Sequence, residues 1–278
     1  MMVWLQVWWI LFHGLFSQAV YPFPGPANPV PSLPTSGLLL WWDTYFGSNC
    51  SGACSDGGSQ VTFADQSGNG NNATLTPVIT ATCVASVYHT NQLNGQPATT
   101  FNGNNTSGSE TCFTVGNSGT GLDNKSTTTL IAVVKFASGP GVELTIAGGS
   151  TNVIRWEGNG IGGGSSLQGA FQGASSSIGF GTAGSDTSNF HLLIFTYDSG
   201  SGAYAFRKDC AADGSGTNAK TINSNWLMLG ADNSGGAHNT LNGQIARFAL
   251  YNRVLSAGEI TTVETNTKFY YGTFGGGC

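Results

Sequence analysis

Charged residues are scarce in this chain of 278 residues. Nine Lys or Arg and 14 Asp or Glu make up 8% of it, whereas a soluble domain usually has about a quarter. Helical bundles and coiled coils are excluded, because they need Glu, Lys and Arg in bulk. A disordered charged tail is excluded too, since it needs many charges to resist collapse. No basic run exists, so binding to nucleic acid through its phosphates is not expected.

The chain is instead rich in glycine and in apolar residues. Its 42 glycines follow no period of three, which excludes collagen, and the 40% hydrophobic content is enough for a packed core. From Gly37 onward, short apolar runs alternate with clusters of Gly, Asn, Ser and Asp. This pattern predicts one all-β sandwich or barrel of about 230 residues.

The N-terminal segment, residues 1–19, has the pattern of a signal peptide. The stretch Val3–Phe16 is apolar, and Ser17-Gln18-Ala19 offers a cleavage site after Ala19. An uncleaved anchor is the alternative, but a span needs about 20 clean apolar residues. We therefore expect a secreted protein, extracellular or on the cell surface, with no membrane span after cleavage.

Residues 20–36 form a proline-rich arm, which holds six of the nine prolines. Such a segment favours an extended polyproline II conformation and serves as a stiff spacer. Four apolar side chains interrupt it: Tyr21, Phe23, Val30 and Leu33. Those side chains would gain from docking, either on this domain or on a neighbouring subunit.

Six cysteines downstream of a signal peptide predict three disulfides, for which 15 connectivities exist. Proximity in sequence favours Cys50–Cys54 and Cys83–Cys112, which leaves Cys210–Cys278. No C-x-x-C pair occurs, so a zinc site is not expected. Glycosylation sequons are present at Asn49, Asn72, Asn104, Asn105 and Asn124.

Ten segments read as strands separated by turn signals. They are Leu38–Tyr45, Gln60–Ala64, Ala98–Phe101, Thr128–Phe136, Val142–Ala147, Asn152–Trp156, His191–Tyr197, Ala203–Arg207, Trp226–Gly230 and Gly243–Tyr251. The run Leu192–Phe195 lacks polar alternation, which predicts a central strand covered on both faces. One helix is predicted, to about Lys268, from a capping box of Ser256 and Glu259 in which Leu255 and Ile260 provide a hydrophobic staple.

Three stretches resemble a known family. Residues 63–74 (FADQSGNGNNAT) resemble its W-x-D-x-S-G-N-G-N-x-A-T segment, and residues 94–103 (NGQPATTFNG) resemble its NGKPAVRFDG strand. The third stretch consists of residues 227–232 (LMLGAD), 241–246 (LNGQIA) and 250–256 (LYNRVLS), which are similar to its closing strand and helix start, and this motif is the most specific. The chain thus resembles the LamG-like jelly rolls of the concanavalin A-like lectin/glucanase superfamily, over residues 37–272.

The resemblance implies a two-sheet antiparallel jelly-roll sandwich with one short C-terminal helix, spanning residues 37–278. Family members often have an acidic residue where this chain has Arg247, a change expected to affect only a surface contact. The fold hosts lectins, hydrolases, lyases, adhesion modules and structural subunits, so it does not fix the function.

Residues for glycoside hydrolysis are not evident, because that reaction usually needs two carboxylates flanking the bond. No E-x-D-x-E pattern occurs among the five Glu, and Glu143 and Glu157 belong to separate candidate strands. The loop Asp232–Asn239 resembles one that supplies a catalytic acid in some arabinofuranosidases, but no partner nucleophile is identifiable. No catalytic residue is therefore assigned.

Carbohydrate contact is the favoured interpretation. Trp156 lies between Arg155 and Glu157, a mixture that suits stacking and hydrogen bonding to a sugar, while Trp41, Trp42 and Trp226 have apolar neighbours typical of a core. The candidate contact residues are Arg155, Trp156, Glu157, Asp232, Asn233 and His238. No cofactor or metal is assigned, although calcium stays open with Asp65, Asp123 or Asp232 as ligands.

Three functions follow from these features. The first is a secreted, non-enzymatic carbohydrate-binding or adhesion module whose partners are glycans. The second is a structural subunit of an extracellular filament or surface assembly, because the strands carry few of the lysines that usually protect sheet edges. The third is a polysaccharide-degrading hydrolase or lyase, against which the missing carboxylate pair counts.

Overall fold

A computed structural model describes residues 33–50, 54–75, 83–104, 109–115, 127–137, 147–148, 152–158, 167–173, 187–219, 227–231 and 240–274. Side chains are described for all of these except 46–50, 147–148, 152–158 and 167–173. Residues 33–278 belong to one structural unit. The predicted signal peptide and most of the predicted arm lie outside the described residues, so both stay predictions.

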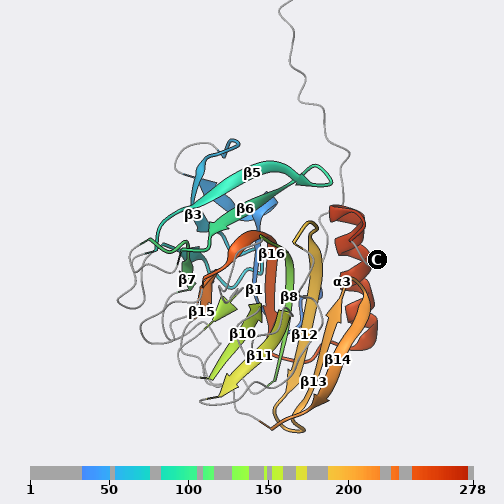
Figure 1. Cartoon of the computed structure of the whole chain (residues 1–278). Coiled ribbons are helices and arrows are strands. Elements are labelled where there is room, and N and C mark those ends of the chain that lie inside the picture. Colours follow the sequence, from blue (N-terminus) through green and yellow to red (C-terminus); the bar gives the residue numbers. More distant parts are fainter. Residues whose placement is uncertain are drawn as a thin grey trace, which may run out of the picture. The chain divides into compact units, whose positions relative to one another are not determined.

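The described residues form an all-β sandwich built from antiparallel strand pairs (Figure 1). Fourteen strands of one sheet pair in the order β14-β13-β12-β8-β16-β6-β5-β3-β4-β7-β15-β9, with β1 beside β16 and β2 beside β3. Their bounds are β1 Leu38–Asp43, β2 Ser48–Cys50, β3 Ser59–Phe63, β4 Ala73–Thr74, β5 Ser86–Leu93, β6 Gln96–Asn102, β7 Phe113–Val115, β8 Thr127–Phe136, β9 Ala147–Gly148, β12 His191–Asp198, β13 Ala203–Lys208, β14 Ala211–Thr217, β15 Leu227–Leu229 and β16 Asn242–Tyr251. A separate ribbon pairs β10, Asn152–Gly158, with β11, Leu167–Gly173.

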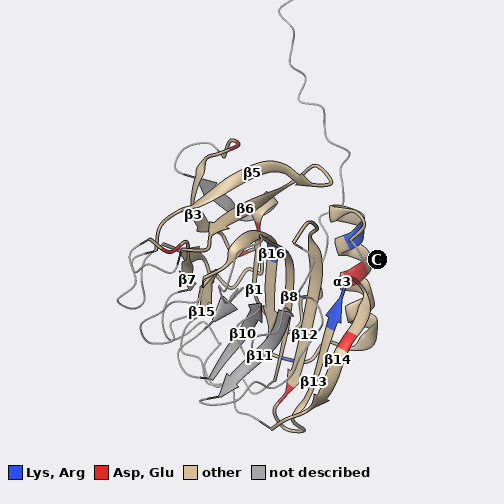
Figure 2. Ribbon diagram, in the orientation of Figure 1, with Lys and Arg blue, Asp and Glu red and all other residues tan. Residues whose placement is uncertain are grey.

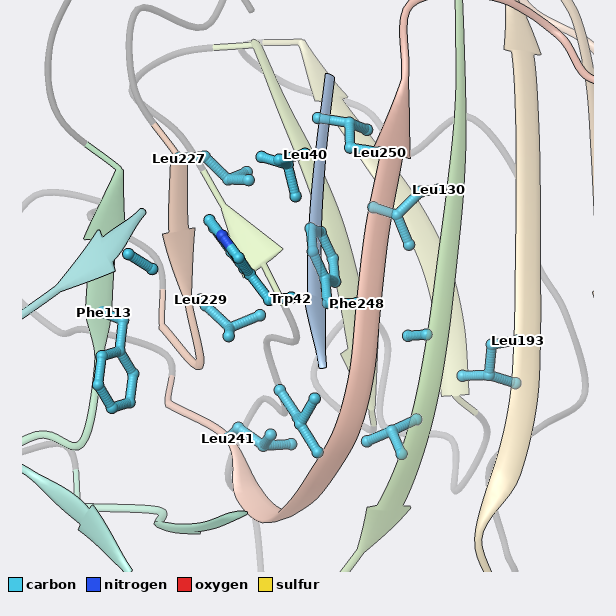
Figure 3. Close-up of a cluster of buried hydrophobic side chains, with 14 of the residues drawn as sticks. Leu40, Trp42, Phe113, Leu130, Leu193, Leu227, Leu229, Leu241, Phe248 and Leu250 are labelled. Carbon is cyan, nitrogen blue, oxygen red and sulfur yellow. The ribbon is translucent and has the colours of Figure 1, made fainter. Parts of the chain in front are cut away.

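The main core lies between two layers of this folded sheet. Trp42 of β1 lies between the leucines of β15 and Phe248 of β16 (Figure 3). Its ring stacks on Phe248 with centroids 5.5 Å apart, and Phe63 meets Phe113 edge-on at 4.9 Å. Large aromatic side chains fill this core because each buries much apolar area in two rotatable angles.

Strand β12 confirms the prediction of a central strand covered on both faces. Leu193 and Phe195 belong to the main core, whereas Leu192 and Ile194 belong to a second apolar cluster. The second cluster lies between the sheet and the helix α3, Ala257–Tyr271. Leu33, the last apolar residue of the predicted arm, is also buried in this cluster.

The predicted start of the helix is confirmed. Ser256 accepts a hydrogen bond from the Glu259 backbone, and the Glu259 carboxylate accepts one from the Ser256 backbone. The helix ends at Tyr271 rather than near Lys268, because Tyr270 and Tyr271 are buried against the sheet. Within the described residues, α3 and the short helix α2, Thr44–Gly47, both lack the length and apolar content needed to cross a membrane.

Some strand predictions needed correction. The first predicted strand, Leu38–Tyr45, ends at Asp43, because the Asp43 carboxylate accepts a hydrogen bond from the Tyr45 N–H and begins α2. Strands β2, β4, β5, β7, β11 and β14 were not predicted from the sequence, and most of the predicted strand Val142–Ala147 lies outside the described residues.

The disulfide Cys83–Cys112 is confirmed, with Cα atoms 5.1 Å apart. Cys54 and Cys210 also take part in disulfides, but the side chains of Cys50 and Cys278 are not described, so the pairs Cys50–Cys54 and Cys210–Cys278 stay predictions.

The structure describes two of the five sequon side chains. Asn72 is exposed and Asn104 is half-buried. The side chain of Asn49 is not described, and Asn105 and Asn124 lie outside the described residues. Glycosylation at all five positions stays a prediction.

Candidate functional site

The sugar-contact residues predicted from the sequence are only partly placed by the structure. Arg155, Trp156 and Glu157 lie in β10, where Trp156 pairs with Gly169 of β11. The three side chains are not described, and Asp232, Asn233 and His238 lie outside the described residues.

A polar hollow of about 320 Å³ lies elsewhere on the sheet. It is lined by Gln92, Thr100, Lys135, Phe136, Ala137, Asn242, Gly243 and Gln244. These residues come from β5, β6, β8, β16 and the residue that follows β8. The volume lies at the lower end of the range for small-molecule sites, about 300–1,000 Å³.

Strand register produces the central row of this hollow. Gln244 of β16 pairs with Thr100 of β6 on one side and with Lys135 of β8 on the other. Paired residues of antiparallel strands project from the same face, so these three side chains stand together. Their chain neighbours Phe101, Phe136 and Ile245 point into the main core, which fixes the polar row on the opposite face.

The same face carries apolar residues closer to the helix. Ala98, Val133 and Ala246 belong to the cluster that α3 covers. Thr100, Lys135 and Gln244 lie two positions further along their strands in the same direction. The hollow therefore begins where the apolar cluster under the helix ends.

Hydrogen bonds position the side chains of the row. The Gln244 Nε2 group donates to Gln92 Oε1 and to Thr100 Oγ1, both at 3.1 Å. Gln92 in turn donates to the Thr90 backbone carbonyl at 2.9 Å. These bonds occupy the amide hydrogens of Gln244 and hold its Oε1 as an acceptor at the surface.

Several polar groups of the hollow have no protein partner. Among the described residues, Lys135 Nζ and the Asn242 carboxamide take part in no hydrogen bond or ion pair. An ammonium group has three donors, and a carboxamide both donates and accepts. The hollow thus offers donors and acceptors that water or a ligand would have to satisfy.

Gly243 is required by the close approach of β8 and β16 below the hollow. A Cβ atom added at this position would lie 2.2 Å from the Lys135 carbonyl oxygen. Any other residue would push the two strands apart at this point. The glycine therefore permits the close pairing of β8 and β16 between its two polar neighbours, Asn242 and Gln244.

The described carboxylates are mostly engaged within the fold, and few charges mark the strands (Figure 2). The engaged groups and their partners are Asp43 with Arg247, Asp56 with Thr90, Asp65 with Ser67, Asp198 with Ser201, Asp209 with His191, Glu259 with Arg253 and Glu264 with Arg207. None of the described residues that line the hollow carries a carboxylate. A glycosidase-type pair of acids is thus not found at this site.

Asp65, proposed above as a calcium ligand, has a structural task. One carboxylate oxygen accepts from the backbone N–H groups of Trp41 and Ser67, and the other from the Ser67 hydroxyl and the Asn71 N–H. All four lone pairs of the carboxylate are therefore used. Asp123 and Asp232 lie outside the described residues, and within the described ones no three metal-ligating side chains gather.

The expectation that Arg247 makes a surface contact is wrong. Its side chain is fully buried between the sheet and α3, where its guanidinium lies 2.8 Å from the Asp43 carboxylate. The rings of Trp41, Tyr270 and Tyr271 surround it at 4.9–5.8 Å. Cation–π contact stabilises an arginine in such a place.

Sequence reasoning missed the hollow itself. Lys135 follows the apolar run Leu130–Val134 of β8, and Gln244 lies near the polar start of β16, which is the one signal that the sequence carries. Nothing in the sequence states that these strands are neighbours or in which register they pair. The site depends on that register.

Comparison with known families agrees with this architecture. The family described as "Concanavalin A-like lectin/glucanases superfamily" matches residues 107–261, more than half of the chain. The chain belongs to this superfamily. No curated protein matches it.

Solved structures show that the superfamily fold extends over most of the chain. Domain 4 of an extracellular arabinanase from Geobacillus stearothermophilus, in complex with arabinotriose, has a TM-score of 0.57 and 16% identity, with 82% of this chain and 98% of that one covered. A Trypanosoma rangeli sialidase has a TM-score of 0.54 and 15% identity, and the match covers 84% of this chain and 33% of the sialidase. An arabinofuranosidase has a TM-score of 0.55 and 15% identity, and the match covers 79% of this chain and 52% of the arabinofuranosidase. The chain thus spans a third to a half of the two enzymes, and at these identities the likeness concerns the fold alone.

Proposed function

We propose that this superfamily member is a secreted, non-enzymatic carbohydrate-binding or adhesion module. The observation that carries the proposal is the polar hollow, whose described lining residues offer unused hydrogen-bonding groups and include no carboxylate. A sugar presents a dense set of hydroxyl groups that both donate and accept, so a binding site needs both kinds of partner. Lys135, Asn242 and Gln244 supply them.

The geometry of the hollow also suits binding rather than bond cleavage. Hydrolysis of a glycoside needs an acid and a second carboxylate about 5–10 Å apart across the bond. The lining residues include one cation and several amides, and the described acids are mostly held by protein donors. Such a site orients a sugar without a group to protonate the leaving oxygen.

The ribbon β10–β11 is a second contact surface in this proposal. Trp156 would stack on a sugar ring, because sugars expose apolar C–H faces, and the residue paired with it in β11 is Gly169. Arg155, Glu157, Asp232, Asn233 and His238 would contribute polar contacts. A domain solved with arabinotriose shares this fold, which supports the choice of glycans as partners.

A glycan array probed with the mature chain tests the proposal. We expect hits that weaken at least about tenfold in Gln244→Ala, because the substitution removes the bonds that order the row. Thr265→Ala on the exposed side of α3 is the matched control, and it should bind as the unchanged chain does. An array without any hit would reject the carbohydrate function.

Two further variants separate the surfaces and the chemistry. Loss of binding in Trp156→Ala with the hollow intact would assign the contact to the ribbon. Release of reducing sugar from mixed polysaccharides, abolished in both Glu157→Gln and Asp232→Asn, would instead support the enzyme alternative. The sialidase and the arabinofuranosidase of similar fold are the reason to perform this assay.

A structural subunit is the second candidate, and the end strand β14 favours it. Within the described part of the chain β14 pairs only with β13, most of its residues are exposed, and Asp213 is its one charged residue. An end strand with so little charge is open to pairing with another chain. Negative-stain microscopy with and without residues 20–36 tests this candidate, and single monodisperse particles in both samples would reject it.

A further inference from the structure

We infer that the hollow selects sugars that carry an anionic group, a carboxylate or a sulfate ester, and that Lys135 holds this group. The inference rests on the proposed carbohydrate function and names the class of sugar that the site takes. It follows from the charge, the partners and the position of Lys135.

Lys135 is the one charged residue among the eight that line the hollow. In the described part of the chain no carboxylate is within ion-pair distance of its ammonium. Among the other described basic side chains of strands β13 and β16, Arg207 and Arg247 hold the carboxylates of Glu264 and Asp43, whereas Lys208 of β13, like Lys135, has no ion pair with a described carboxylate. Lys135 differs from Lys208 in lining the hollow, beside the hydrogen-bonding groups of Gln244 and Asn242.

The register places this charge beside neutral hydrogen-bonding groups. Lys135 pairs with Gln244, and Gln244 pairs with Thr100. A ligand anion on the ammonium would therefore bring its ring hydroxyls to the Gln244 Oε1 and the Asn242 carboxamide, which lie in the same hollow. An anionic sugar matches all of these groups, whereas a neutral sugar leaves the ammonium without a counter-charge.

The strand holds Lys135 in place from both sides. Val134 and Phe136 anchor β8 in the main core with 0% and 2% of their surfaces exposed. A charge-assisted hydrogen bond is about twice as strong as a neutral one, which makes this residue the main source of selectivity.

The size of the hollow limits what enters it. About 320 Å³ corresponds to the lower end of known ligand sites, room for about one sugar ring. The chain as a whole carries a net charge of −5, so it does not attract anions at long range. Selectivity for an anionic sugar would therefore arise locally, at short distance from Lys135.

Titration calorimetry with matched ligands tests the inference on the mature, enzymatically deglycosylated chain. The ligands are oligogalacturonate and a sulfated galactan, each compared with the neutral oligogalactan of equal length. We expect at least one anionic ligand to bind about tenfold more tightly than its neutral partner, since one charge-assisted bond is added. Comparison of the carboxylate with the sulfate then identifies the preferred anion.

Three variants assign the preference to Lys135. Lys135→Met should abolish the preference, so that the anionic and neutral oligosaccharides bind this variant with equal affinity, while Lys135→Arg should retain the preference. Lys208→Met is the matched control, because Lys208 is another half-buried lysine in a strand of the same sheet. That variant should retain the full preference.

The outcomes separate this inference from the proposed function. Equal binding of neutral and anionic ligands would overturn the inference and leave the carbohydrate function standing. A preference that persists in Lys135→Met would overturn the assignment to the hollow. Absence of binding to every sugar, on this panel and on the array, would overturn both.

Discussion

Arg247 Nη2 lies 2.8 Å from Asp43 Oδ2, and neither side chain is exposed to solvent. The Tyr271 hydroxyl donates to the same Asp43 oxygen at 3.0 Å, so the pair joins β1 and β16 to the last turn of α3. Burial raises the pKa of Tyr271 well above its ordinary value, which keeps this hydroxyl a donor. The helix is thus attached to the sheet by a polar contact inside an apolar cluster.

Removal of the Arg247 side-chain charge should destabilise the fold strongly. Arg247→Met leaves the Asp43 carboxylate buried without its cation, which costs about 3–5 kcal/mol in the free energy of unfolding. Urea denaturation followed by tryptophan fluorescence measures this loss. Arg253→Met is the control, since its pair with Glu259 is partly exposed and such pairs contribute less than about 1 kcal/mol. Equal effects in the two variants would contradict the proposed attachment.

Asp65 provides a second prediction, because its carboxylate joins the turn after β3 to β1. Asp65→Ala leaves the N–H groups of Trp41, Ser67 and Asn71 without acceptors and should lower the free energy of unfolding by about 2–4 kcal/mol. Ser67→Ala removes only the hydroxyl bond and should cost about 1 kcal/mol. The stability difference between the unchanged chain and Asp65→Ala should be the same in thermal unfolding with calcium and with a chelator. A difference that depends on calcium would instead indicate that Asp65 is a metal ligand.

The Cys83–Cys112 disulfide should contribute measurable stability. Both half-cystines are buried beside Met228 and Ala231, and the bridge spans 29 residues. The double variant Cys83→Ala/Cys112→Ala should therefore lose about 3 kcal/mol in urea denaturation. Peptide mapping without reduction supplies the check on connectivity, because it must recover the Cys83–Cys112 pair and would also test the predicted Cys50–Cys54 and Cys210–Cys278 pairs.

The sequence predicted those parts of the fold that depend on local patterns. The capping box of Ser256 and Glu259 and the doubly buried run Leu192–Phe195 were both readable, because caps and continuous apolar runs act within a few residues. Strand β14 was missed because its sequence, AADGSGT, shows no apolar alternation and only its last residue, Thr217, is β-branched. Its pairing depends on β13, which lies beside it in space.

The functional parts were less predictable for a related reason. Arg247 was expected at the surface, because a charged residue in a strand is normally solvated, and the aromatic enclosure that buries it comes from β1 and α3. The hollow depends on which residues of β6, β8 and β16 lie opposite one another. Register of this kind arises from the packing of the whole sandwich, so no single segment encodes it.

The start of α3 gives a prediction on pH. Hydrogen bonds from Arg253 and then from the Ser256 backbone and hydroxyl lower the pKa of Glu259 to about 2, from 4.5. A carboxyl whose pKa is lowered on folding stabilises the native state above its unfolded pKa, and that contribution is lost as the pH falls through the folded pKa. The stability difference between the unchanged chain and Glu259→Gln should therefore be constant above about pH 5 and decline between about pH 4.5 and pH 2.

Urea denaturation across this range measures the difference, and two variants make it specific. The stability difference between the unchanged chain and Arg253→Gln should decline over the same pH range, because this variant loses the donor that contributes most to the lowered pKa of Glu259. Thr265→Ala, an uncharged change on the exposed side of the same helix, should show a difference independent of pH. A Glu259→Gln difference that stays constant down to pH 2 would mean that the carboxylate keeps its unfolded pKa in the native state, and the bonds from Arg253 and Ser256 would then be too weak to position the helix.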